Sequence, residues 1–408
     1  MDYQDLRKLF HISEDEAAAA YQQRVASKDA LKINVSISGF PAFCLMDSEV
    51  FRLILQAERL EKEITELVHQ LPGRAIQQYF DNCLIDEIVL TNEIEGVNSS
   101  RREIGEVLER LENNDRRGRF SGIVEKYVAL QKGIEVPLQT CVDIRNVYDQ
   151  LVLDEVLAQN PKYAPDGELF RAGPVEVYDA AQRAIHHGIE PEESIIEALD
   201  VALNLLNDES VETLVRISLF HFLFAYAHPF YDGNGRCNRF ISSYILAREF
   251  DPLVGLRLSF AIKEQIRKYY RAFTLCEHPL NKGDLTPFVI LFSEIVVEAL
   301  ASMRDSLSEL KGLLDQAHDL MMDIPGITDG RDAMVKDLLS MASLLIQAAL
   351  FAEWGIRSKE LAMAMEVSVP TVYQRLKFFE SQGLMLKRKT GRDTFYAMDL
   401  EKLRALAG

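Results

Sequence analysis

One stretch of twelve residues, lying between two apolar helical stretches, constrains this chain more than any other feature. The stretches 211–226 and 240–248 are apolar enough to predict two packed helices. Between them, residues 228–239 read HPFYDGNGRCNR and hold one imidazole, one carboxylate, two glycines and two arginines. A loop of this composition between two helices predicts an anion-binding site with a base attached.

The polar residues of this loop suit the binding of a phosphate chain. Gly233 and Gly235 let backbone amides approach an anion, and a helix beginning near Arg236 adds its positive end. Arg236 and Arg239 are three residues apart, so they share a helix face and can grip the same phosphate chain.

Two further residues of the loop predict metal binding and acid–base chemistry. Asp232 can hold Mg²⁺ against the phosphates. His228, followed by the rigid Pro229, can accept a proton from an attacking hydroxyl. A simple helix-capping turn would explain the glycines, but it would not explain a histidine, an acid and two spaced arginines together.

These residues resemble the signature of the Fic family, H-P-F-x-[D/E]-G-N-G-R-x-x-R, and they match it at every defined position. The resemblance implies a helical Fic core that transfers AMP from ATP to a Ser, Thr or Tyr hydroxyl of a target protein, with Mg²⁺ as cofactor. It also implies roles for individual residues: amides near Gly233, Asn234 and Gly235 hold the β-phosphate, Arg236 holds phosphate oxygens, Arg239 holds the γ-phosphate, Asp232 binds Mg²⁺ and His228 is the base.

A second motif lies upstream, in Thr91-Asn92-Glu93-Ile94-Glu95-Gly96. It resembles the inhibitory-helix motif of the family, [S/T]-x-x-x-E-[G/N], although a helix ending in Glu-Gly is also an ordinary glycine C-cap. The resemblance predicts that Glu95 pairs with Arg239 and removes the charge that should hold the γ-phosphate. Glu95 positioning a water for removal of AMP from a modified target is the alternative.

Two other segments are expected near the active site. Residues 170–177 are predicted to form a hairpin around Gly173-Pro174, which in the Fic family is the flap that pairs with the target segment. Tyr270 or Tyr269 is expected near the adenine, with core packing as an equal alternative. His186 and His187 are expected in a loop and not as a metal pair.

The C-terminal segment resembles a winged helix-turn-helix domain. Helices are predicted at 334–351, 358–365 and 368–381, followed by a hairpin at 384–398. The resemblance implies duplex DNA binding through 368–392, with Thr371, Gln374 and Arg375 facing the groove and cations of the wing at 387–392 meeting phosphates. Protein contact is an equal alternative.

Composition limits the remaining choices. The net charge of the 408 residues is −18, which argues against broad affinity for nucleic acid. Residues 346–408 carry ten Lys/Arg against seven Asp/Glu, so residues 1–345 hold a net −21. Five scattered cysteines and no signal peptide or apolar run of membrane length predict a cytoplasmic protein without a membrane partner.

The expected fold is mostly α: a Fic helical core with a small β-hairpin flap, plus the C-terminal winged helix-turn-helix domain. The segments expected are an N-terminal helical region with the inhibitory helix at 1–115, the Fic core at 116–325 and the winged domain at 326–408. The target protein and the assembly state, monomer or homodimer, are left open.

Overall fold

The computed structural model of the chain describes residues 3–112, 114–178, 184–324, 333–390 and 393–407. These residues pack into two compact units. Unit 1 comprises Met1–Lys62 and Cys83–Ala301, and unit 2 comprises Glu63–Asn82 and Ser302–Gly408. Three helices, α3 (Ser48–Gln70), α4 (Gly73–Ile94) and α15 (Thr286–Met322), contribute residues to both units. The segment boundaries at 115 and 325 remain predictions.

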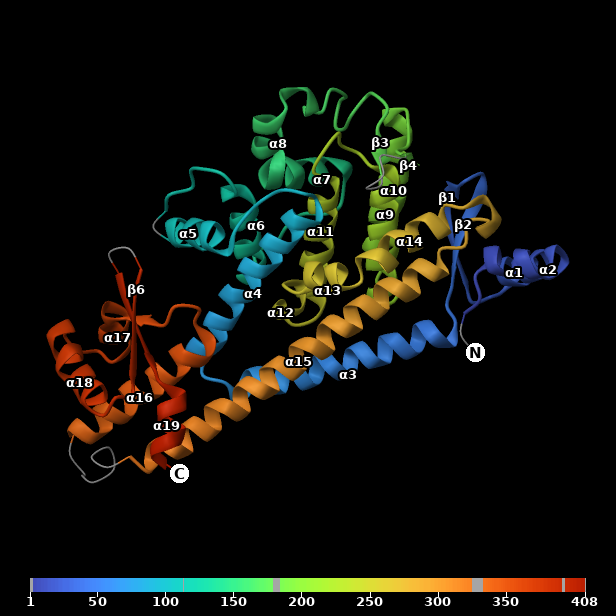
Figure 1. Cartoon of the computed structure of the whole chain (residues 1–408). Helices are drawn as coiled ribbons and strands as arrows, with labels where there is room; N and C mark the ends of the chain where they lie inside the picture. The colour runs from blue at the N-terminus through green and yellow to red at the C-terminus, as the bar shows by residue number, and fades with distance from the viewer. Residues whose placement is uncertain (1–2, 113, 179–183, 325–332, 391–392, 408) are drawn as a thin grey trace. The chain divides into compact units, whose positions relative to one another are not determined.

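Helices form the core of unit 1 (Figure 1). The central pair is α10 (Thr213–Ala227) and α11 (Asn234–Glu249), and α9 (Glu192–Leu206) packs against α10. Both central helices are buried over nearly their whole length. The apolar composition of α10 on all sides accounts for its burial, whereas α11 also buries polar residues, among them the two arginines of the loop. The two predicted helices are confirmed, but the second begins at Asn234 because residues of the polar loop form its first turn.

Residues 141–159 form one helical stretch with an interruption. It consists of α7 (Cys141–Tyr148), a π-helical turn η1 (Asp149–Leu153) and α8 (Asp154–Gln159). Thr140 caps it in a capping box with Asp143. The other helices of unit 1 are α1 (Leu6–Ile12), α2 (Glu14–Ala26), α5 (Arg101–Glu112), α6 (Ser121–Gln131), η2 (Pro161–Tyr163), α12 (Pro252–Gly255), α13 (Leu258–Glu264), α14 (Ile266–Cys276) and η3 (Pro279–Asn281).

Unit 1 also contains two antiparallel hairpins, β1 (Ala30–Ile37) with β2 (Phe40–Leu45), and β3 (Glu176–Tyr178) with β4 (Ala184–His187). The prediction of a hairpin within 170–177 is wrong in position, because the pairing joins 176–178 to 184–187. Arg171 instead donates its backbone N–H to the carbonyl of Pro229, 3.0 Å away. His186 and His187 lie in β4, so their predicted loop is also wrong.

The C-terminal part of unit 2 has the element order predicted from its sequence. It runs α16 (Ala333–Phe351), β5 (Ile356–Arg357), α17 (Ser358–Ala364), α18 (Val369–Ser381), β6 (Met385–Thr390), β7 (Asp393–Met398) and α19 (Leu400–Ala407), with strand order β5-β7-β6. Leu376 and Phe379 of α18 are buried. Arg375 of α18, expected to face DNA, instead forms an ion pair with Asp337 of α16, because opposite charges on the two helices lie within reach of each other.

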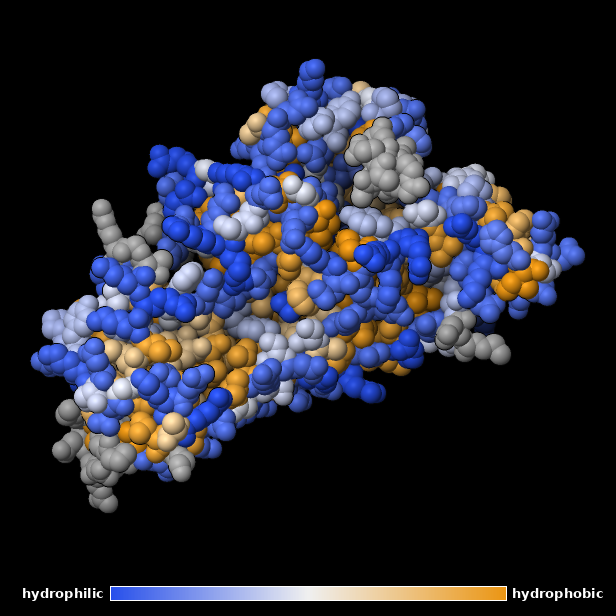
Figure 2. Space-filling model, viewed as in Figure 1, coloured by the Kyte–Doolittle hydropathy of each residue, from blue (hydrophilic) through white to orange (hydrophobic). Residues whose placement is uncertain are grey.

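The surface of the face shown in Figure 2 is mostly hydrophilic, with smaller apolar areas between the polar ones. Among the described residues, one helix, α15, is long and apolar enough to cross a membrane by length and composition alone. Its most apolar 18-residue window is 72% buried within the protein, which is also true of core helices.

Candidate active site

His228 follows the last residue of α10 and turns the chain into the signature loop, residues 228–239. Its backbone is left-handed, with φ 50° and ψ 60°, and its N–H donates to the carbonyl of Phe224 at 3.0 Å. A residue other than glycine in this conformation costs about 1–2 kcal/mol, so surrounding contacts must hold the turn.

Arg171 supplies these contacts. Its buried guanidinium donates from Nε to the carbonyl of His228 at 2.7 Å, and from Nη1 to that of Gly173 at 2.6 Å. Nη2 donates to the carbonyl of Ile189 at 2.8 Å. A Cβ atom on Gly188 would come within 2.3 Å of Nη2, so the brace also needs glycine there. Sequence reasoning missed this role, because Arg171 has no motif around it.

The rest of the loop is clamped from inside. Asn234 donates from Nδ2 to the carbonyl of Phe230 at 2.7 Å and accepts its N–H at 2.9 Å. Phe230 is fully buried, and its ring stacks on that of Tyr148 with centroids 3.6 Å apart. Gly233 has φ 82°, and a Cβ there would lie 2.9 Å from Cγ2 of Val152. The π-helical turn η1, which contains Val152, therefore fits directly under the loop.

His228 faces a cavity of about 150 Å³. The cavity is lined by Glu95, His186, Ala225, His228, Asn234, Gly235, Asn238, Arg239, Tyr269, Tyr270, Phe273, Thr274 and Glu277. Burial lowers the pKa of His228 to about 3, and the positive charges of His186 and Arg171 act in the same direction. The imidazole is therefore neutral at physiological pH and can accept a proton.

Arg239 is held by the end of α4. Its Nη2 lies 2.9 Å from Oε1 of Glu95, and it also donates from Nε to Oγ1 of Thr91 at 2.8 Å and from Nη2 to the carbonyl of Thr91 at 3.0 Å. Burial alone would lower the pKa of Arg239, but the Glu95 carboxylate together with Tyr269 and Tyr270 offsets this, and the pKa is raised. The contact predicted between Glu95 and Arg239 is thus present.

The Glu95 carboxylate also lies over the first turn of α11. A Cβ atom on Gly235 would be only 2.0 Å from Oε1 of Glu95, so this carboxylate lies against the glycine backbone at the positive end of a 16-residue helix. The carboxylate therefore lies at Gly235, where the sequence predicts an anion site together with Gly233 and Asn234.

A buried carboxylate on α4, that of Glu87, connects this helix to α13 eight residues before Glu95. Glu87 is fully buried and accepts hydrogen bonds from Ser259 of α13, from the backbone N–H at 2.9 Å and from the hydroxyl at 2.6 Å. Burial raises the pKa of Glu87 to about 7, although the bonds from Ser259 act against this. Sequence reasoning missed Glu87, since nothing local marks it.

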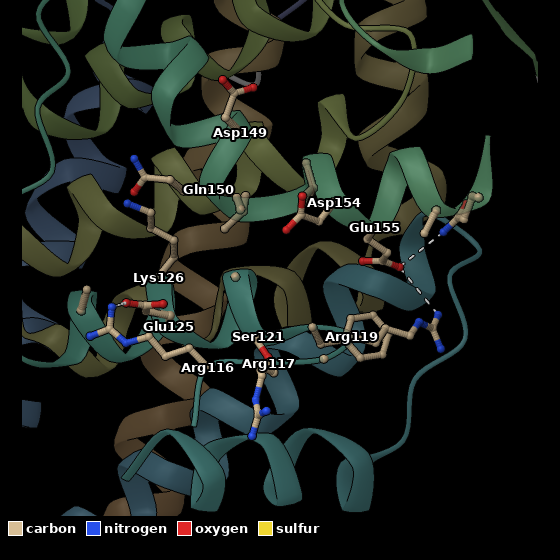
Figure 3. A pocket seen from close by; sticks show the side chains of 18 of the residues that line it. Arg116, Arg117, Arg119, Ser121, Glu125, Lys126, Asp149, Gln150, Asp154 and Glu155 are labelled. Carbon is tan, nitrogen blue, oxygen red and sulfur yellow. Dashed lines mark hydrogen bonds and ion pairs between the residues drawn. The ribbon is translucent and has the colours of Figure 1, made fainter. Parts of the chain in front are cut away.

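Arg236 is also fully buried, but it has fewer partners. Its Nη1 lies 2.9 Å from Oε2 of Glu155 on α8, whereas Nε and Nη2 have no hydrogen-bond partner in the described part of the chain. Glu155 also lines a separate surface pocket of about 1290 Å³ between α6 and α8, where it points toward Arg119 (Figure 3). In that pocket Arg116 is paired with Glu125 (Figure 3).

The remaining predicted residues divide between cavity and core. Tyr270 and Tyr269 both line the cavity, but Tyr270 is 43% exposed, whereas Tyr269 is buried and its hydroxyl lies 2.7 Å from Nε2 of His221. His221 is fully buried and is thus a packed core residue. Cys237 is fully buried, and burial raises the pKa of its thiol, so it is a filler of the helix and not a nucleophile.

Asp232 is half-buried at the turn before α11, and its Oδ1 accepts the N–H of Gly233 at 2.6 Å. No cluster of three or more His, Cys, Asp or Glu suited to a metal ion is found within the residues that the structure describes. Mg²⁺ needs no such cluster, because it commonly binds through one or two carboxylates plus substrate phosphates and water. Asp232 therefore fits a nucleotide-dependent magnesium site.

The comparison with known families agrees with this geometry. Residues 140–246 match the model of the Fic/DOC family. The protein adenylyltransferase fic-1 of Caenorhabditis elegans is 30% identical over 156 residues, which are 36% of this chain and 28% of that protein. The protein adenylyltransferase Fic of Drosophila erecta is 34% identical over 98 residues, 23% of this chain and 18% of that protein.

Among solved structures, a Fic family protein from Desulfovibrio desulfuricans G20 shares the fold. It matches with a TM-score of 0.51 and 18% identity, over 86% of this chain and 96% of that one. The present chain spans less than a third of the length of the curated relatives named above.

Proposed function

We propose that this protein is a protein adenylyltransferase that transfers AMP from ATP to a Ser, Thr or Tyr hydroxyl of a target protein. The observation that carries the proposal is the shared cavity, in which a neutral His228 lies beside the anion site at Gly235 and Arg239. A base next to a phosphate-binding helix terminus suits attack on a phosphate. The names of the relatives that match the Fic domain support the same reaction.

The proposed step balances as follows. His228 takes the proton of the target hydroxyl while the hydroxyl oxygen forms a bond to the α-phosphorus of ATP. The bond from that phosphorus to the bridging oxygen of the β-phosphate breaks, and pyrophosphate leaves. Backbone amides at Gly233 and Gly235 and the two arginines hold the developing negative charge. Nε and Nη2 of Arg236, which have no hydrogen-bond partner among the described residues, are the donors proposed for phosphate oxygens.

Magnesium is the cofactor proposed for this site. Asp232 would hold the ion, which would neutralise phosphate charge and assist the departure of pyrophosphate. Tyr270, the exposed tyrosine of the cavity, is proposed to lie beside the adenine.

The protein is proposed to inhibit itself through Glu95. The carboxylate takes the place of an anion at Gly235 and occupies Arg239, so the γ-phosphate loses its partner. A volume of about 150 Å³ supports this reading, because pockets for ligands of nucleotide size usually span about 300–1,000 Å³.

Transfer of label from α-phosphate-labelled ATP tests the reaction. We expect Glu95→Gly to label itself or a lysate protein at least tenfold more than the wild type, and the double variant Glu95→Gly, His228→Ala to lose the label. Glu93→Gly is the matched control, since Glu93 lies on the same helix but pairs with Lys263 at the surface. Absence of label in Glu95→Gly would contradict adenylylation, and equal label without His228 would exclude it as the base.

Removal of AMP from a modified target is the alternative at the same site. It is favoured by one observation, that the Glu95 carboxylate lines the cavity with His228 and can hold a water there. Incubation of a labelled target with the protein and Mg²⁺, without ATP, separates the two reactions. Release of AMP by the wild type but not by Glu95→Gly would favour removal.

The target segment is proposed to pair with the β3–β4 hairpin, at 176–178 and 184–187, by strand addition. The β3–β4 hairpin is thus proposed as the flap that the sequence analysis expected at residues 170–177. The five cysteines are all buried and none of them forms a disulfide bond, which supports a reducing compartment such as the cytoplasm.

DNA binding by the C-terminal helices is a second candidate function. The order α16-β5-α17-α18-β6-β7 and the exposed Lys387, Arg388 and Lys389 of β6 favour a winged helix-turn-helix domain. The pairing of Arg375 with Asp337 weakens the candidate, leaving Gln374 exposed on α18. Binding of the full-length protein to duplex DNA should weaken steeply with salt. No binding at low salt would exclude this function.

A further inference from the structure

A second histidine lies beside His228 in the same cavity. His186 belongs to β4, and its ring centroid is 6.3 Å from that of His228. The side chain of His186 is 11% exposed. None of the motifs of the signature loop or of the inhibitory helix includes it.

Both ring nitrogens of His186 face oxygen atoms. Nδ1 lies 2.8 Å from Oε2 of Glu277, and Nε2 lies 2.9 Å from the backbone carbonyl oxygen of Tyr226. A carbonyl oxygen and an ionised carboxylate can only accept hydrogen bonds, so both contacts are satisfied when each ring nitrogen carries a proton. The geometry therefore favours the imidazolium form.

The position at the end of α10 favours the same form. Tyr226 lies in the last turn of this 15-residue helix, where the final carbonyl groups have no partners within the helix. Arg171 donates to the carbonyls of Ala227 and His228 at this terminus, and His186 donates to that of Tyr226. Two cations thus lie at the negative end of the helix dipole, a favourable arrangement.

From these contacts we infer that His186 is a positioning residue for His228. As an imidazolium it donates to a C-terminal carbonyl group of α10, and its charge adds to the effect of burial in keeping the neighbouring His228 unprotonated and ready to accept a proton. The same contacts tie strand β4 to α10 and to the end of α14. The inference deepens the proposed function, because it matters for catalysis only if His228 is the base, but the charge arrangement exists without that function.

The other charged and titratable groups around His186 are consistent with this arrangement. Glu277 faces it from the end of α14, and His228 and Arg171 face the same space from the signature loop and from the segment before β3. The Tyr226 ring lies 5.4 Å away, and burial raises the pKa of its phenol, which keeps it neutral. On the same strand, His187 is 71% exposed and pairs with Glu176 instead.

Nitrogen NMR of the histidine rings in the full-length wild-type protein tests the inference without ATP or target. At pH 7 we expect two protonated ring nitrogens for His186 and one for His228. Signals are assigned by their loss in His186→Gln and His228→Gln. A wild-type His186 with one unprotonated ring nitrogen at pH 7 would overturn the inference, whatever any variant does.

A matched pair of variants tests the coupling between the two rings. At the lowest pH at which the proteins stay folded, the protonated fraction of His228 should rise about threefold or more in His186→Gln, a shift of about half a pH unit. His187→Gln should leave it unchanged, although it removes the same ring one residue away. An unchanged His228 titration in His186→Gln would overturn the inference. A positive NMR result without AMP transfer would contradict only the proposed function.

Discussion

Arg236 and Arg239 lie three residues apart on α11 and are both buried, yet their surroundings differ. Arg239 is held by the end of α4, through the Glu95 carboxylate and two oxygens of Thr91. Arg236 has one partner, Glu155, and two buried nitrogens without any partner in the described residues. Arg239 is thus occupied by residues at the end of α4, whereas Arg236 keeps two hydrogen-bond donors without partners among the described residues.

Under the proposed function, this difference indicates how a phosphate site can have all its residues in place and still be inactive. Buried hydrogen-bond donors without partners cost free energy, and a phosphate that accepted hydrogen bonds from Arg236 would remove this cost. Arg239 already has an acceptor in the Glu95 carboxylate. Under the proposed function, the regulatory step is the exchange of partners at Arg239, and Arg236 needs no such exchange.

Replacing each arginine separately should give the largest difference in the free energy of unfolding. Arg239→Met removes an ion pair and two hydrogen bonds and leaves the Glu95 carboxylate without its cation, so we expect a loss of about 3 kcal/mol in the free energy of unfolding. Arg236→Met removes one ion pair together with two unsatisfied nitrogens, so we expect a loss of about 1 kcal/mol or less. Urea unfolding of both variants measures the difference. An equal or greater loss in Arg236→Met would refute the contrast.

Glu87 lies on α4, the helix that holds Arg239, and it makes the stability of the protein depend on pH. Its folded pKa of about 7 exceeds the ordinary value of 4.5, so the folded protein binds more protons between these values. Stability from this group is present below about pH 4.5 and is lost as the pH rises to about 7, by up to about 3 kcal/mol. Glu87→Gln should remove that fall in unfolding free energy, whereas the surface variant Glu93→Gln should keep it. Identical pH slopes in wild type and Glu87→Gln would show that Glu87 is not the group responsible.

Thr91→Val should give the smallest effect. Valine keeps the shape of threonine but removes the hydroxyl that accepts from Arg239, a loss of about 1 kcal/mol in the docking of α4. If docking controls activity, self-labelling with AMP should rise about fivefold over the wild type, less than in Glu95→Gly. Labelling equal to that of the wild type would mean that this hydrogen bond does not contribute to inhibition.

Much of the site could be predicted from sequence, because the signature loop is long and each position has a chemical reason. The two central helices and the contact between Glu95 and Arg239 were predicted in this way. The roles of Arg171, Glu87 and His186 could not be, because each depends on contacts between residues far apart in the chain. Arg171, for example, reaches His228 across 57 positions. The predicted position of the hairpin is wrong because turn-forming residues such as Gly173-Pro174 indicate where a regular element ends, but they do not show which segments pair as strands.

Intact-mass spectrometry of Glu95→Gly after incubation with ATP and Mg²⁺ tests the central claim most directly. The claim is that Glu95 holds Arg239 in place of a phosphate, so its removal should release AMP transfer. We predict a mass increase by one AMP group or more in Glu95→Gly, little or none in the wild type, and none in Glu95→Gly, His228→Ala. An unmodified Glu95→Gly protein, folded and shown to bind ATP, would contradict the account.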